Sequence, residues 1–80
     1  MKNLTINDWD LVEGVKTYFK GDADLAQDWL EMFSDFGDVP LSELVEPAAE
    51  FAIENELPFR VLDAIDQNED GEVTWIIEMR

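Results

Sequence analysis

The sequence predicts an α+β fold, in which three helices pack on a small antiparallel sheet that includes a C-terminal β-hairpin. Between residues 8 and 54, apolar residues recur at three- and four-residue spacing, which indicates helices. Residues 73–79 have the two-residue alternation of a strand, and the turn-forming residues 68–71 precede them. The 80 residues are expected to form one small acidic domain, residues 1–80.

The composition is that of a folded protein with an acidic surface. The formal net charge is −15, yet 46% of the residues are hydrophobic, which is too apolar for a disordered acidic tail. There is no Cys and no His, so thiolate metal sites and the commonest general base are excluded. No apolar run resembles a signal peptide or a membrane span, so we expect a cytoplasmic protein that anionic membranes and nucleic acid repel.

The first half of the chain predicts a short edge strand and two helices. Residues 2–6 are the strand, and a helix follows that is capped by Thr5 or Asn7 and ends at Gly21. The second helix begins at Asp22 and runs to about Phe36, where Gly37 ends it. Its apolar face consists of Leu25, Trp29, Met32, Phe33 and Phe36. This face places Trp29 in the core, and the alternation of the last strand places Trp75 there.

The third helix follows residues 38–40, with Asp38 or Ser42 as its cap. Pro47 falls inside it, where proline removes a hydrogen bond and costs ~3 kcal/mol. Either the helix kinks there, or one short helix ends at Glu46 and another begins with Pro47.

Residues 59–66 are expected to pair with the last strand as a hairpin. In a regular strand, however, Asp63 would share a face with the apolar residues Phe59 and Val61. A short helix that begins at Pro58 is the alternative. If Asp63 is buried among apolar neighbours, it is also the one candidate for acid–base chemistry.

Two rows of carboxylates dominate the middle of the chain, and no basic residue lies between Lys20 and Arg60. The first acidic stripe comprises Asp24, Asp28, Glu31 and Asp35, and the second comprises Glu43, Glu46, Glu50 and Glu54. At these spacings each set lies along one helix face, where like charges cost ~0.2–0.5 kcal/mol per pair. Solubility alone needs a net charge of only ~2–8, so the uniform sign indicates a surface that binds a basic partner.

As a small, cysteine-free and strongly acidic domain, the chain resembles the acidic inhibitors of phages and mobile elements that mimic nucleic acid. Among them are anti-restriction proteins and some anti-CRISPR proteins. The resemblance is carried by the two acidic stripes. It implies a stoichiometric inhibitor, not an enzyme, that needs no cofactor. Its carboxylates would pair with Lys and Arg in the nucleic-acid-binding groove of a host defence complex.

Three other interpretations remain open. An acidic antitoxin or immunity protein would plug a basic toxin active site, with Trp9 and Tyr18 as exposed anchors beside the acids. The segment from Asp66 to Gly71 resembles the start of an EF-hand loop and suggests a calcium-binding module, although Ile77 stands where the closing glutamate belongs. The blandest interpretation is a solvated acidic surface with no specific partner, as in halophilic adaptation.

Overall fold

The computed structural model describes residues 3–34 and 39–80. The described elements are β1 (Asn3–Asn7), α1 (Asp8–Glu13), α2 (Val15–Tyr18), α3 (Ala23–Ser34), α4 (Leu41–Glu54), β2 (Phe59–Gln67) and β3 (Val73–Met79). They confirm the predicted α+β fold with its C-terminal hairpin. None of the described helices is long and apolar enough to cross a membrane.

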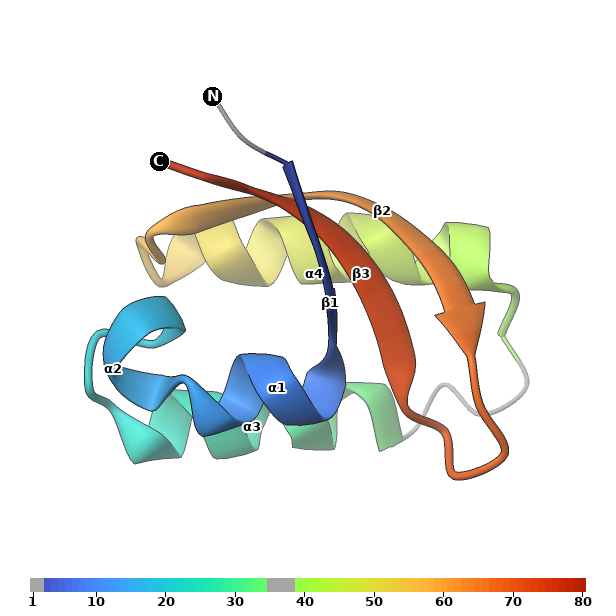
Figure 1. Ribbon diagram of the computed structural model, residues 1–80, viewed down its shortest axis with the longest axis horizontal. Helices are drawn as coiled ribbons and strands as arrows, with labels where there is room; N and C mark the ends of the chain where they lie inside the picture. Colours follow the sequence, from blue (N-terminus) through green and yellow to red (C-terminus); the bar gives the residue numbers. More distant parts are fainter. Residues whose placement is uncertain (1–2, 35–38) are drawn as a thin grey trace.

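The sheet is antiparallel, with strand order β1-β3-β2, so that the last strand lies in its centre. Figure 1 shows α4 behind this sheet and the pair α1 and α3 below it. Residues 59–66 thus form a strand rather than a helix. The inward residues of β3 are Val73, Trp75 and Ile77, and all three are fully buried.

Two bulges in β2 resolve the conflict over Asp63. The pairing with β3 shifts by one residue between Val61 and Asp63 and again between Ala64 and Asp66. Because each bulge inserts one residue, it reverses the alternation that follows it. Ala64 therefore points into the core, whereas Asp63 is exposed.

The predicted first helix is divided in two, which corrects the expectation of one helix up to Gly21. The chain turns at Gly14, and a Cβ atom there would lie 2.6 Å from the ring of Tyr18. The apolar spacing continues across this turn, so the predicted helix extended through Gly14. Asn7 rather than Thr5 is the cap, since its Oδ1 accepts a hydrogen bond from the Asp10 amide at 2.8 Å.

The second helix begins as predicted. The Oδ1 atom of Asp22 accepts hydrogen bonds from the amides of Asp24, at 3.0 Å, and Leu25, at 3.3 Å. The predicted end at Phe36 and Gly37 lies outside the described residues.

The third predicted helix runs through its proline. α4 is one helix from Leu41 to Glu54 with Pro47 inside it, so the alternative of two separate helices is wrong. Its buried face (Leu44, Ala48 and Ala52) packs against β2, and this burial offsets the cost of the proline. Pro40 precedes the helix without a side-chain cap, so Ser42 lies inside the helix and does not cap it; Asp38 lies outside the described residues.

Trp29 is the centre of the core, as its place on the apolar face predicts. It is fully buried, and its ring packs edge-on against aromatic rings from four other elements or turns. Its edge-on neighbours include Phe19, Phe51, Phe59 and Trp75, with ring centroids 5.4–6.0 Å from that of Trp29. The core therefore joins both long helices to the sheet through one indole ring.

Candidate functional site

The acidic stripes lie on the solvent-facing sides of the two long helices. Every stripe residue that the structure describes is exposed, while Asp35 lies outside the described residues. On α3 the stripe is opposite the buried Ala26 and Trp29, and on α4 it is opposite Leu44 and Ala48. Because α4 is unbroken, its stripe is one continuous row of about 16 Å, at ~1.5 Å per residue.

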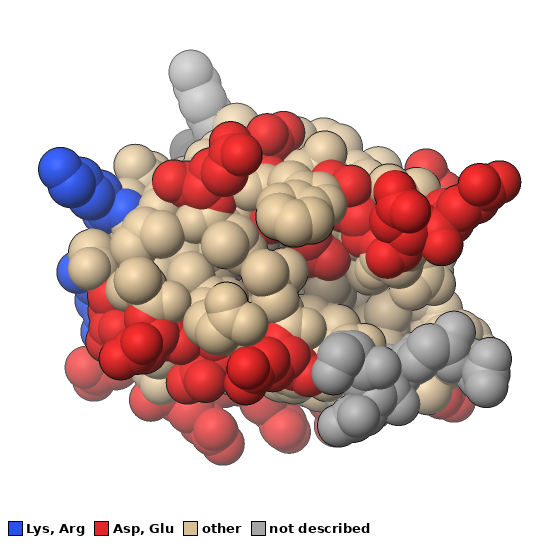
Figure 2. Space-filling model, turned by 90° about the horizontal axis from the view of Figure 1, so that it is seen from below, with Lys and Arg blue, Asp and Glu red and all other residues tan. Residues whose placement is uncertain are grey.

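The contacts of Arg60 and Lys20 lie at the sheet and at the C-terminal end of α4, respectively. Within residues 3–34 and 39–80, the one ion pair joins Arg60 to Glu78 at 3.4 Å across the sheet. Lys20 donates a hydrogen bond through Nζ to the carbonyl of Asn55 at 2.7 Å, just beyond the end of α4. Figure 2 shows the Lys and Arg atoms at the left end, while acidic atoms gather along the upper and lower edges of this face with other residues between them.

The two stripes do not form one flat pair of rows. In Figure 1, α3 and α4 run in opposite directions, α3 at the bottom and α4 behind the sheet. They meet through the core, where the ring centroids of Trp29 and Phe51 are 5.7 Å apart. Each stripe faces away from this shared core, so the two rows diverge and give the molecule two acidic sides.

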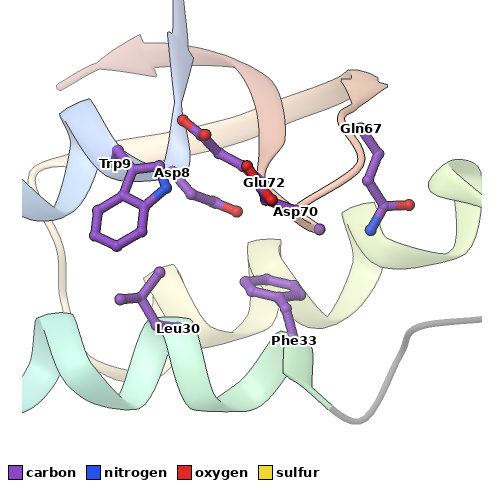
Figure 3. A pocket seen from close by; sticks show the side chains of 8 residues that line it. Asp8, Trp9, Leu30, Phe33, Gln67, Asp70 and Glu72 are labelled. Carbon is purple, nitrogen blue, oxygen red and sulfur yellow. The ribbon is translucent and has the colours of Figure 1, made fainter.

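A pocket that the sequence analysis missed opens between the start of α1, α3 and the β2–β3 hairpin. It has a volume of about 380 Å³. It is lined by Asp8, Trp9, Leu30, Phe33, Gln67, Asp70, Gly71 and Glu72 (Figure 3). These residues come from three separate segments, so no local pattern could have brought them together.

Asp8 lies at the floor of this pocket and is the most unexpected residue of the structure. Only 4% of its surface is exposed. Its Oδ1 accepts hydrogen bonds from the indole Nε1 of Trp29, at 3.1 Å, and from that of Trp75, and its Oδ2 accepts one from the Val73 amide at 2.9 Å. The one available signal was indirect, because two buried indole N–H groups each need an acceptor.

Of the two proposed aromatic anchors, one is exposed and the other is packed. Trp9 exposes 57% of its surface at the edge of the pocket. Tyr18 is half-buried, and its ring packs edge-on against Phe59 with a centroid distance of 6.0 Å. Only Trp9 is therefore placed to contact a partner.

The EF-hand-like segment forms a hairpin turn. Asn68 closes it, since its Oδ1 accepts hydrogen bonds from the amides of Asp70, at 3.1 Å, and Glu72, at 2.9 Å. Gly71 adopts the positive φ of +84° that this kind of three-residue hairpin loop requires. The oxygen at the third position of the calcium motif is thus used within the turn, and the described part of the chain contains no cluster of three acidic side chains arranged to hold a metal ion.

Asp63, the carboxylate considered for acid–base chemistry, also has a structural explanation. It is exposed, and its Oδ1 accepts a hydrogen bond from the Ala64 amide at 2.8 Å, at one of the bulges of β2. An exposed carboxylate lacks the apolar surroundings that such chemistry needs.

Comparison with protein-family models, with curated proteins and with solved structures found no match for this chain. Its function is therefore inferred from the acidic stripes and from the pocket beside Trp9.

Proposed function

We propose that this protein is a stoichiometric inhibitor whose acidic helical surface mimics nucleic acid and blocks the basic nucleic-acid-binding groove of a host defence complex of the CRISPR or restriction type. The observation that carries this proposal is the exposure of the stripe carboxylates on two helices. No basic residue of the sequence lies between Lys20 and Arg60 to neutralise them.

The arrangement suits a groove that holds a polyanion. Four charges over about 16 Å place one carboxylate every ~5 Å, a charge density of the same order as that of one DNA strand, which carries one phosphate per ~3.4 Å of helix axis. The divergence of the stripes favours a target that surrounds the protein on two sides, such as a cleft between domains. Long-range attraction would make association fast and sensitive to salt.

The same charges define which partners are excluded. A surface of this sign is repelled by nucleic acid and by anionic membranes, so the partner is a basic protein rather than DNA, RNA or lipid. A protein that inhibits a defence complex of its host would act in the host cytoplasm, and it would need neither a cofactor nor a catalytic residue.

The test is capture of the partner with tagged protein from lysate of the host cell. A nucleic-acid-binding complex is expected, and added DNA or RNA should displace it. Simultaneous replacement of four stripe residues by Lys should abolish capture; the four are Asp28, Glu31, Glu46 and Glu50.

A matched control separates the stripes from overall charge. Four exposed acids outside the stripes (Asp10, Glu13, Glu56 and Glu69) are replaced by Lys, which gives the same net charge. This variant should still capture the complex at physiological salt. If both variants bind alike, the stripes are not the binding surface and the proposal is wrong.

A second candidate function is an antitoxin or immunity protein that plugs the basic active site of a toxin. The exposed Trp9 favours it, because tryptophan is enriched among the residues that dominate protein interfaces. Capture would then yield a single small enzyme, and Trp9→Ala would weaken binding more than any single stripe replacement.

A further inference from the structure

The pocket beside Trp9 combines an apolar side with an acidic rim. Trp9, Leu30 and Phe33 supply the apolar surface, and the hairpin supplies Asp70 and Glu72. In Figure 3, Trp9 and Leu30 lie on one side of the opening, with the two hairpin acids facing them from above Phe33. Such a lining offers both a surface for hydrocarbon and acceptors for a cation.

The pocket has unused binding capacity. Trp9 leaves 57% of its surface exposed, which is a large aromatic area open to a binding partner. The Asp70 carboxylate has no hydrogen-bond or ion-pair partner within the described residues. Asp8, by contrast, is buried and already accepts three N–H donors, and Glu72 Oε2 accepts one hydrogen bond from Asn68 Nδ2 at 3.0 Å.

Charge selects a cationic occupant. Three carboxylates line the pocket, and no described lining residue is basic. Apolar walls of low dielectric concentrate a field of one sign inside a cleft. An apolar side chain would gain nothing from this field, and an anion would be repelled.

We infer that the pocket binds an arginine side chain presented by the basic partner. The methylene stem of the arginine packs on Leu30 and Phe33, and its planar guanidinium stacks on the exposed face of Trp9. The guanidinium donates hydrogen bonds to the carboxylates of Asp70 and Glu72. Lysine fits less well, because its compact ammonium is strongly hydrated and cannot stack.

The pocket is large enough to admit a single long side chain. Its volume of about 380 Å³ is near the lower end of the ~300–1,000 Å³ of small-ligand sites. The inference rests on the proposed function for the basic character of the partner, but the pocket can be tested without that partner.

The test uses two short capped peptides of equal length and charge, one rich in arginine and one rich in lysine. Binding to the full chain is measured by calorimetry, and the indole N–H signal of Trp9 is followed by NMR. The arginine peptide should bind more tightly and shift this signal. Trp9→Ala should lower its affinity by about two- to fivefold, the range of an exposed cation–π contact, with no effect on the lysine peptide.

Matched variants test separately the contributions of apolar and acidic side chains to peptide binding. Ile53→Ala removes an apolar side chain that is 63% exposed on α4, away from the pocket, and should change nothing. Asp70→Asn should weaken the arginine peptide, whereas Glu69→Gln, at an exposed hairpin residue outside the lining, should weaken both peptides equally and slightly. Circular dichroism confirms that each variant is folded.

Three outcomes would overturn the inference: equal affinity for the two peptides, an unchanged arginine affinity in Trp9→Ala, or no binding of either peptide. None of them affects capture of a nucleic-acid-binding complex through the stripes. Conversely, failure of that capture leaves the arginine preference of the pocket intact, so the two proposals can fail separately.

Discussion

Replacement of Asp8 by alanine is expected to be the most damaging single change among the acidic residues. The carboxylate accepts hydrogen bonds from two buried indoles and from the Val73 amide, and the variant leaves all three donors without an acceptor. Hydrogen bonds to a charged group contribute ~1.5–3 kcal/mol each. Alanine also removes the desolvation cost of a buried carboxylate, which offsets several kcal/mol and leaves a net loss of about 3–5 kcal/mol.

This loss is large for a domain of this size. At ~0.05–0.15 kcal/mol per residue, the whole free energy of unfolding is about 4–12 kcal/mol. A loss of 1 kcal/mol lowers the midpoint of thermal unfolding by ~4–8 °C in small domains, so Asp8→Ala should lower it by more than about 12 °C. Far-UV circular dichroism gives the midpoint of thermal unfolding, and urea unfolding followed by the same signal gives the free energy of unfolding. Neither depends on the fluorescence of Trp29 and Trp75, which the substitution itself perturbs.

Two further variants make the test decisive. Asp10→Ala removes an exposed acid from the same helix and should cost only about 0.5 kcal/mol. Asp8→Asn keeps one oxygen for the indoles but turns an NH₂ group toward the Val73 amide, so its loss should lie between the other two. If the free energy of unfolding of Asp8→Ala lies within about 1 kcal/mol of that of the unmodified protein, the three hydrogen bonds give no net stabilisation. The role assigned to Asp8 in the core would then be wrong.

Three other predictions concern the turn, the proline and the hairpin. Gly14→Ala places a Cβ atom 2.6 Å from the ring of Tyr18 and should cost about 1–3 kcal/mol in urea unfolding, whereas no loss would show that the ring moves freely. Pro47→Ala restores an amide donor to the interior of α4 and should raise the free energy of unfolding by about 1–2 kcal/mol; a decrease would show that the proline is favourable there. Millimolar calcium should leave the tryptophan emission unchanged, because Asn68 Oδ1 already accepts two amides, and a saturable response would restore the calcium interpretation.

Local signals in the sequence predicted much of the fold. Asp22 and the apolar spacing after it defined the start of α3, and the alternation at 73–79 defined β3. The break at Gly14 was missed because an apolar face can continue across a turn. The bulges of β2 were missed because an inserted residue can be recognised only when the pairing with the neighbouring strand is known. A single sequence does not contain this pairing.

For the candidate site, too, the sequence predicted the local features and missed those that depend on tertiary packing. Spacing alone predicted that each acidic stripe follows one helix face, since that depends only on helix geometry. The divergence of the stripes depends on how α3 and α4 pack through Trp29, and the pocket depends on three segments that meet only in the folded chain. The buried role of Asp8 was missed, because its donors come from residues 21 to 67 positions away.

The central position of β3 has a consequence for how the protein is made. Both of its neighbours, and the Asp8 carboxylate that binds Val73 and Trp75, precede it in the chain. During synthesis, β1 and β2 have no strand between them until β3 leaves the ribosome, so the sheet cannot assemble from its N-terminal end. Until then the net charge of −15 opposes association of its exposed apolar residues with other chains, through repulsion between like charges.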